Sequence, residues 1–108
     1  MILHLALCLS LAVEPGHVKR VIDGDTFALY DVDVVGEARV RILDVDAPER
    51  GQPGFADATE YTRAWLARAP FALVACEKDS FGRLLARITR GQESLAEALV
   101  AAGFARWR

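Results

Sequence analysis

Residues 41–46 alternate with a period of two, which sends successive side chains to opposite faces of a β-sheet. One predicted face carries Arg41, Leu43 and Val45, and the other carries Ile42, Asp44 and Asp46. Pro48 has no N–H for a sheet ladder and favours extended geometry in the residue before it. We therefore expect one strand that ends at Ala47, with a carboxylate-rich turn and Glu49 just beyond it.

The rest of the first half of the chain also predicts strands. Runs rich in β-forming residues cover positions 17–23 and 26–30, and the turn residues Asp23-Gly24-Asp25 lie between them. These two runs predict a hairpin. A loop containing Gly36 separates the hairpin from the third strand, which we expect over residues 38–44.

The second half of the chain begins with the clearest helical pattern in the sequence, over residues 55–69. Its apolar and small residues recur at helical spacing, at Phe55, Ala58, Thr62, Trp65, Leu66 and Ala69. Strands are predicted over residues 71–76 and 84–89, joined through a turn at 79–83. Ser94 and Glu97 form a capping-box signature for a short final helix that Gly103 closes.

The predicted order of elements is β-β-β-α-β-β-α. Short strands must protect their edges from pairing with other chains, and closing the sheet removes those edges. We therefore predict a mainly β fold with helices, organised as a five-stranded barrel of the OB-fold type. One helix follows strand 3 and a short helix follows strand 5.

Length and composition indicate one folded domain, with 108 residues, 53% of them hydrophobic and 26% charged. The net charge of −2 gives no global signal for nucleic acid, although the potential in a groove can differ in sign from the whole molecule. Cys8 and Cys76 are too few for a disulfide framework, and neither has a cysteine or histidine at zinc-ligand spacing.

The apolar run at residues 1–13 is too short to span a bilayer and has two interpretations. A secretory signal fits its apolar character and the small residues around Leu11, but the run lacks a basic start. The alternative is an N-terminal strand. A signal covering Met1 to Ala12 would make the mature domain, residues 14–108, secreted or periplasmic and free of the membrane. A strand would leave the protein cytoplasmic.

Four carboxylates lie in two turns that neighbouring strands could bring together: Asp23, Asp25, Asp46 and Glu49. A hard divalent cation would relieve their mutual repulsion, and ligands that are all oxygen favour calcium or magnesium over zinc. The alternative for Asp23 and Asp25 is that they only form a turn, as aspartate commonly does beside glycine.

Two arginines add a second kind of chemistry. Arg41 precedes the acidic turn, and a guanidinium is shaped for two-point binding of phosphate. Arg83 lies in the turn that contains Asp79, where the alternative is a surface residue with a local ion pair. Arginines beside carboxylates suit phosphodiester hydrolysis, which needs charge stabilisation, a metal and a base for water. We expect Phe81 to be a core residue, with stacking on a base as the alternative.

These motifs resemble those of the staphylococcal nuclease (thermonuclease) family. The resemblance covers roughly residues 14–107, through VIDGDTF at 21–27, RILDVDAPE at 41–49, DSFGR at 79–83 and LAEALVAAGFA at 95–105. It implies an OB-fold barrel with packed helices and calcium-dependent cleavage of DNA and RNA that leaves 3′-phosphate ends. We expect the protein to be a monomer.

The resemblance also implies roles for single residues. Asp25 and Asp46 match calcium-binding carboxylates, Ala47 matches a ligand that uses its backbone carbonyl, and Asp23 would support the metal through water. Glu49 matches the proposed general base. Arg41 and Arg83 match the pair that binds the phosphate, and Phe81 and Arg83 would contact the substrate.

Three features of the chain differ from the best-known member of that family. Ala47 replaces a threonine, and Ser80-Phe81 replaces a Lys-Tyr pair that contacts the nucleotide. The sequence also stops at Arg108, before the tyrosines and last helix of the longer enzymes. The alternative functions are a non-catalytic nucleic-acid-binding module of the same family and a structural domain that binds calcium for stability. The filled catalytic positions favour the enzyme.

Overall fold

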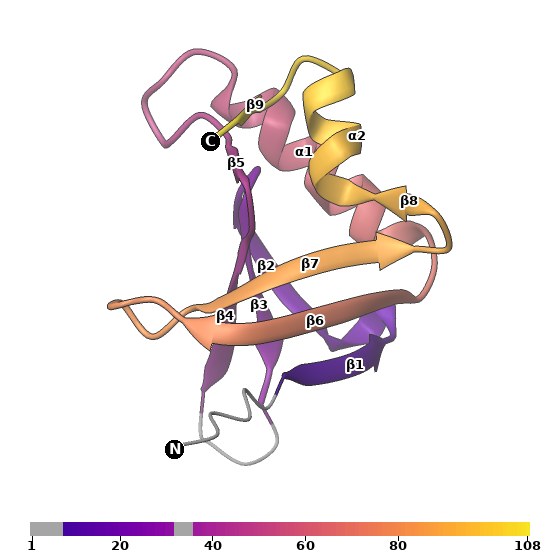
Figure 1. Cartoon of the computed structure of the whole chain (residues 1–108). Coiled ribbons are helices and arrows are strands. Elements are labelled where there is room, and N and C mark those ends of the chain that lie inside the picture. The colour runs from indigo at the N-terminus through magenta and orange to yellow at the C-terminus, as the bar shows by residue number, and fades with distance from the viewer. Residues whose placement is uncertain (1–7, 32–35) are drawn as a thin grey trace, which may run out of the picture.

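The computed structural model describes residues 8–31 and 36–108 (Figure 1). Its helices are α1 (Phe55–Arg68) and α2 (Leu95–Ala101), and a 3₁₀ turn covers Pro15–His17. The strands are β1 (Leu9–Val13), β2 (Val18–Asp23), β3 (Thr26–Tyr30), β4 (Glu37–Ile42), β5 (Val45–Asp46), β6 (Phe71–Lys78), β7 (Leu84–Arg90), β8 (Glu93–Ser94) and β9 (Arg106–Trp107). The predicted mainly β fold with two helices is confirmed.

The main sheet has the order β1-β6-β7-β4-β3-β2. Its ladders are antiparallel except for the parallel pairing of β4 with β7, and β8 adds a short ladder to β7. A separate small ladder joins β5 to β9. The ladders described for residues 8–31 and 36–108 do not link β1 to β2, so closure of a five-stranded barrel is not confirmed.

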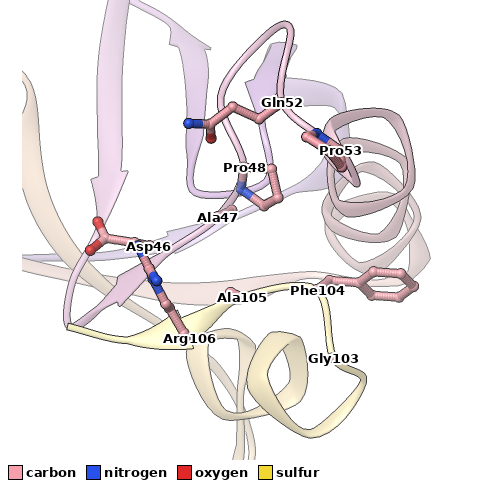
Figure 2. A pocket seen from close by; sticks show the side chains of 9 residues that line it. All are labelled: Asp46, Ala47, Pro48, Gln52, Pro53, Gly103, Phe104, Ala105 and Arg106. Carbon is pink, nitrogen blue, oxygen red and sulfur yellow. The ribbon is translucent and has the colours of Figure 1, made fainter.

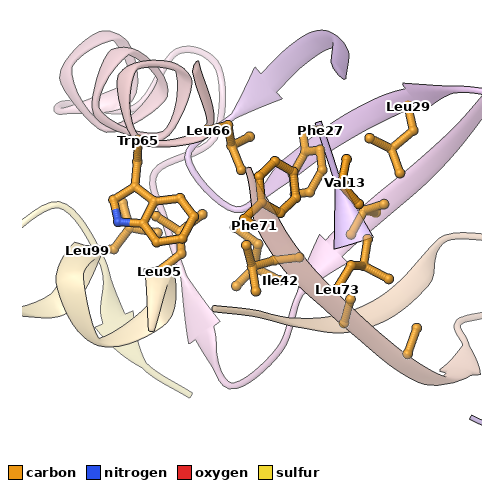
Figure 3. Packing of buried hydrophobic residues seen from close by; sticks show 14 of the residues in the cluster. Val13, Phe27, Leu29, Ile42, Trp65, Leu66, Phe71, Leu73, Leu95 and Leu99 are labelled. Atoms are coloured by element: carbon orange, nitrogen blue, oxygen red, sulfur yellow. The ribbon is translucent and has the colours of Figure 1, made fainter. Parts of the chain in front are cut away.

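The hydrophobic core lies between the two helices and the sheet (Figure 3). Helix α1 contributes Trp65 and Leu66, and helix α2 contributes Leu95 and Leu99. They meet apolar side chains of the sheet such as Phe27, and burying each large side chain contributes about 1.5–3 kcal/mol. Neither helix in the described part of the chain has the length and hydropathy needed to cross a membrane.

The N-terminus of α2 has the serine cap of the predicted capping box. Ser94 has extended backbone geometry, and its Oγ accepts a hydrogen bond from the Glu97 N–H at 3.3 Å. This satisfies one of the backbone donors that a helix start leaves unpaired. In Figure 1 α2 lies beside α1 at one end of the sheet, and α2 also contacts β9.

The prediction of one continuous strand through residues 41–46 is wrong. Strand β4 ends at Ile42, and Asp44 has a φ of 72°, in the left-handed region that aspartate tolerates better than most residues. The chain therefore turns before β5 begins at Val45. This turn removes the expected alternation, so Arg41 and Asp46, predicted on opposite faces, lie in direct contact at 2.7 Å.

The N-terminal run contributes an edge strand. β1 pairs antiparallel with β6 from Leu9 opposite Ala75 to Val13 opposite Phe71, and only Val13 is buried. A disulfide joins Cys8 to Cys76 across a sequence separation of 68, a pairing that cysteine counting did not predict. Residues 1–7 of the predicted signal lie outside the described residues, so the choice between signal and strand stays a prediction.

A chain that begins at Val13 is expected to fold cooperatively, because the residues removed from β1 are exposed and Val13 keeps its core position. It should be less stable than the full chain. Closing a loop of this length is worth about 4 kcal/mol in the chain-entropy model, and the disulfide is lost. Urea denaturation followed by circular dichroism measures both chains. The Cys8→Ser/Cys76→Ser double variant separates the disulfide from the strand. An unfolded shortened chain would rule out a removable signal.

Candidate active site

The turn between β2 and β3 is fixed against helix α1. The carbonyl of Gly24 accepts a hydrogen bond from Thr62 Oγ1 at 2.6 Å, and the Asp25 N–H donates to Asp23 Oδ1 at 3.1 Å. Gly24 also has no room for a side chain, since an added Cβ would lie 2.8 Å from Ala47 Cβ. The helix therefore sets the position of the two aspartates.

Gly24→Ala is expected to destabilise the protein by about 1–3 kcal/mol, because its methyl group would overlap Ala47 and Ala58. Gly16→Ala is the matched control, since an added Cβ there meets nothing within 4 Å. That variant should stay within about 0.5 kcal/mol of the wild type. Urea denaturation of both proteins provides the comparison, and equal stabilities would mean that the close contact at Gly24 relaxes at no cost.

Asp25 connects the hairpin turn to the segment after β4. Its side chain is buried, and Oδ2 accepts a hydrogen bond from the Ala47 N–H at 2.8 Å. Oδ1 accepts from Thr26 Oγ1 at 3.0 Å. The Asp25 carbonyl also accepts from the Ile42 N–H at 2.8 Å. Two predicted site segments are thus joined through one residue.

The Arg41 guanidinium lies inside this junction and is only 7% exposed. Nη1 donates to the carbonyls of Ile42 at 2.6 Å and Val45 at 2.8 Å. Nη2 lies 2.7 Å from Asp46 Oδ1 and 3.4 Å from Asp25 Oδ2. Arg41 therefore compensates the charge of two carboxylates that would otherwise face each other without a cation.

Asp23 has the most perturbed acidity in the site. Burial and the neighbouring Asp25 carboxylate together raise the pKa of Asp23 from 3.8 to about 7. Because the folded state then holds a proton that the unfolded state has lost, Asp23 favours folding below about pH 4 and loses this contribution as the pH rises towards 7.

Asp23→Asn should therefore flatten the pH dependence of stability between about pH 4 and 7, and should raise the free energy of unfolding at pH 8. Asparagine keeps an oxygen that can accept the Asp25 N–H. The measurement is urea denaturation across this pH range in the presence of a chelator. A variant with the same slope as the wild type would show that Asp23 is ionised normally.

One cavity of about 380 Å³ brings the separate motifs together. Of the predicted site residues, it is lined by Asp23, Asp25, Arg41, Asp46, Ala47, Glu49 and Arg83. Glu49 is exposed, and its N–H donates to Gln52 Oε1 at 2.8 Å, so the carboxylate lies at the rim of the cavity. The arrangement combines the exposed carboxylate of Glu49, three aspartates and arginine side chains in one cavity.

Arg83 enters the cavity from the turn between β6 and β7. Asp79 Oδ2 accepts from Arg83 Nε at 2.7 Å, and Asp79 Oδ1 accepts from the backbone N–H groups of Phe81 and Arg83, each at 2.9 Å. Partial burial acts to raise the pKa of Asp79, but these hydrogen bonds lower it overall. Arg83 thus combines the predicted local ion pair with a place in the cavity.

Phe81 is not a core residue, contrary to the expectation from sequence. It lies at the tip of the turn and is 72% exposed, and it does not line the cavity that holds the other predicted residues. The Arg83 guanidinium carbon lies 5.4 Å from its ring centroid. The tight turn around Gly82, with a φ of 80°, directs the segment away from the core.

Comparison with known proteins shows the family of this chain. The family model described as staphylococcal nuclease homologue matches residues 39–108. The chain belongs to the staphylococcal nuclease family. It is 36% identical over 98 residues to a thermonuclease of Staphylococcus hyicus and 37% identical over 97 residues to that of Staphylococcus intermedius. It is also 30% identical over 73 residues to an uncharacterized endonuclease of Escherichia coli.

These matches cover most of the chain but only part of the relatives. Each thermonuclease match includes 82% of this chain and 56% of the relative, and the Escherichia coli match includes 68% and 46%. The chain therefore spans about half the length of the curated relatives it matches. The family match begins after the hairpin turn, so it includes Arg41, Asp46, Glu49 and Arg83 but neither Asp23 nor Asp25.

In this staphylococcal nuclease family member, the side-chain oxygens of the site are of the kind that a hard cation prefers as ligands. Asp25 and Asp46 place oxygens within 3.4 Å and 2.7 Å of the same Arg41 nitrogen. The two carboxylates are therefore close neighbours, and both pair with the Arg41 guanidinium. Among the described residues, no three acidic, histidine or cysteine side chains converge closely enough to form a ready metal site. Arg41 occupies the space between the carboxylates.

Three residues of the cavity were missed by sequence reasoning: Gln52, Arg106 and Arg108. The two arginines come from β9 and its end, which the antiparallel ladder places against β5. Arg106 lies opposite Asp46 in that ladder, and Arg108 Nε lies 4.0 Å from Asp46 Oδ2. A two-residue strand has no sequence period, so nothing in the pattern distinguished these arginines from surface charge.

Proposed function

We propose that this chain is a calcium-dependent nuclease that hydrolyses phosphodiester bonds of DNA and RNA and leaves 3′-phosphate ends. The observation that carries the proposal is the single cavity in which Arg41, Arg83, Glu49 and the aspartates meet. Membership of the staphylococcal nuclease family supports it. The relatives named thermonuclease and endonuclease support the same reaction class.

The residues that would hold the cation are Asp25, Asp46 and the Ala47 carbonyl, with Asp23 supporting it through water. When bound, calcium would neutralise part of the phosphate charge and so favour approach of a nucleophile. Asp25 keeps the Ala47 segment in place through its hydrogen bond with the Ala47 N–H. The turn at Asp44 brings Asp46 to the same side as Asp25.

Glu49 would take a proton from the attacking water, because its carboxylate is exposed at the rim and lies outside the Arg41 ion pairs. Arg83 is the more accessible of the two arginines and would bind a phosphate oxygen first. Arg41 would exchange one of its internal contacts for a phosphate oxygen as negative charge develops. Together the two guanidinium groups would stabilise the charge of the transition state.

The second candidate is a nucleic-acid-binding module without hydrolysis. The observation that favours it is the burial of Arg41, whose Nη1 and Nη2 both contact protein oxygens. A guanidinium that kept all of these contacts would have little capacity left for a phosphate. The two candidates agree on a nucleic-acid ligand and differ only in whether the bond is broken.

Cleavage assays with the purified full chain test the proposal. Single-stranded DNA and RNA are incubated with calcium, magnesium, zinc or excess chelator, and the product ends are determined by mass spectrometry. The expected result is calcium-dependent cleavage of both polymers with 3′-phosphate ends. Glu49→Gln is the control for a contaminating nuclease. Equal cleavage in chelator, or cleavage restored by zinc alone, would contradict the metal assignment, and binding without cleavage would favour the second candidate.

A further inference from the structure

A second cavity of about 450 Å³ lies beside the candidate active site (Figure 2). One wall is the segment that follows β5, with Pro48, Gln52 and Pro53. The opposite wall is the segment between α2 and β9, with Phe104 and Arg106. The volume lies in the range of sites for small organic ligands.

The two cavities are adjacent. They share four lining residues: Asp46, Ala47, Gln52 and Arg106. Figure 2 shows Arg106 reaching from β9 towards Asp46, while Phe104 lies at the other end of the second cavity. Arg106 therefore stands where the two cavities meet.

Arg106 differs from the other arginines of the active-site cavity in its partners. Arg41 is bound to Asp46, Arg83 is bound to Asp79, and Arg108 lies 4.0 Å from Asp46. Within the described residues, the Arg106 guanidinium has neither a hydrogen bond nor an ion pair. Its side chain is exposed, so its donors are available to an anionic ligand.

We propose that the second cavity binds the nucleotide next to the scissile phosphate, with Arg106 contacting the phosphate of that nucleotide. This inference rests on the proposed nuclease function and adds a substrate subsite to it. The charge of Arg106 suits a phosphate of the chain, because planar guanidinium groups bind phosphate oxygens in pairs. The four lining residues shared with the active-site cavity favour the next unit of the same strand as the occupant.

The remaining walls suit a sugar and a base. Pro48 and Pro53 present apolar rings without side-chain polar groups, and Phe104 adds an aromatic ring. Tyr61 packs against the Phe104 ring, with 5.2 Å between the ring centroids. Such surfaces accept any base, because they contact its face rather than its hydrogen-bonding edge. The subsite is therefore expected to distinguish substrates by the length of the strand and not by its base sequence.

Cleavage of two substrates of different length tests the subsite. A DNA dinucleotide offers one phosphodiester, whereas a tetranucleotide also places a phosphate at Arg106. Arg106→Ala is expected to lower kcat/KM for the tetranucleotide by about tenfold or more, mainly through KM, and for the dinucleotide by less than about twofold. Arg106→Lys should recover part of the loss. Arg50→Ala removes the same charge from a residue that lines neither cavity and should affect both substrates alike.

Binding provides an independent measurement. In the Glu49→Gln background, anisotropy of a labelled tetranucleotide in calcium should show the tenfold loss for Arg106→Ala. The slope of log K against log salt should fall by about 0.7, the value of one phosphate contact on a single strand. This measurement does not depend on hydrolysis.

The outcomes separate the subsite from the nuclease function. Equal loss for both lengths in Arg106→Ala, or a loss no larger than that of Arg50→Ala, would overturn the subsite and leave the nuclease in place. Absence of cleavage by the wild type, with the tenfold binding loss retained, would overturn the nuclease and support the binding subsite. A chain that binds neither oligonucleotide would overturn both.

Discussion

Arg41→Lys is expected to lower turnover by about 10³- to 10⁵-fold, the range found for arginines that stabilise charge in phosphoryl transfer. Lysine keeps the charge but loses the planar group with five donors. In this structure the loss has a second cause, because Arg41 Nη1 contacts two carbonyls while Nη2 contacts Asp46. A single ammonium group cannot reach all of these oxygens at once.

The same substitution should also reduce stability, since one partner of a buried ion pair is changed. Removing such a partner outright costs about 3–5 kcal/mol, and lysine should cost less because the charge remains. Arg83→Lys is the matched variant. Its guanidinium is more exposed, so turnover should fall while stability changes by less than about 1 kcal/mol.

Turnover at saturating substrate and urea denaturation of both variants provide the measurements. Near wild-type turnover in both would make these arginines structural or surface cations rather than catalytic residues. A folded Arg41→Lys protein with lost turnover would place the effect in the chemistry. Loss of turnover in Arg41→Lys alone would instead indicate that Arg83 serves only its ion pair with Asp79.

Much of the fold could be predicted because the longer helices and strands have enough residues to show their period. Helix α1 was expected over residues 55–69 and covers Phe55–Arg68, and its predicted apolar positions Trp65 and Leu66 are buried. The strand expected over 84–89 covers Leu84–Arg90. In these segments, side-chain spacing and tertiary burial favour the same structure.

The errors lie where one backbone torsion or one distant contact decides the structure. The left-handed conformation of Asp44 breaks a strand whose side-chain pattern is continuous. The exposed tip at Phe81 follows from a turn whose direction an aromatic residue alone does not reveal. The disulfide of Cys8 depends on the pairing of β1 with β6, and its two cysteines are 68 positions apart in the sequence.

The candidate site was predicted more fully than its surroundings. Motifs at three separate places named seven of the ten residues that line the active-site cavity, because each motif carries its own unusual combination of charge and turn residues. Arg106 and Arg108 reach the same cavity through the β5–β9 ladder. That ladder has only two residues on each strand, which is too short for a period to appear.

Calcium is expected to raise the melting temperature of the wild type. A ligand that binds only the native state stabilises it by about 2.7 kcal/mol at a hundredfold excess over its Kd. For a domain of this size that corresponds to a shift on the order of 10 °C. Asp25→Asn should lose most of this shift and should lose cleavage, because it removes one of the two carboxylates that lie beside Arg41.

Asparagine at position 25 keeps an oxygen for the Ala47 N–H, so the variant should remain folded without calcium. This separates loss of the metal from loss of the structure. Asp44→Asn is the control for removal of a carboxylate outside the cavity, since Asp44 pairs with Arg87 on the surface. Its calcium shift and its turnover should match those of the wild type.

Glu49→Gln should behave differently from Asp25→Asn. If Glu49 acts as a base, the variant keeps the proposed ligands Asp25 and Asp46 and therefore most of the calcium shift, while turnover falls by about 10²- to 10⁴-fold. Its exposed position at the rim, outside the Arg41 ion pairs, supports this division of roles. Thermal melts with and without calcium, paired with cleavage assays, decide the assignment. If Glu49→Gln loses the calcium shift as completely as Asp25→Asn does, Glu49 is a metal ligand, and another group must accept the proton from water.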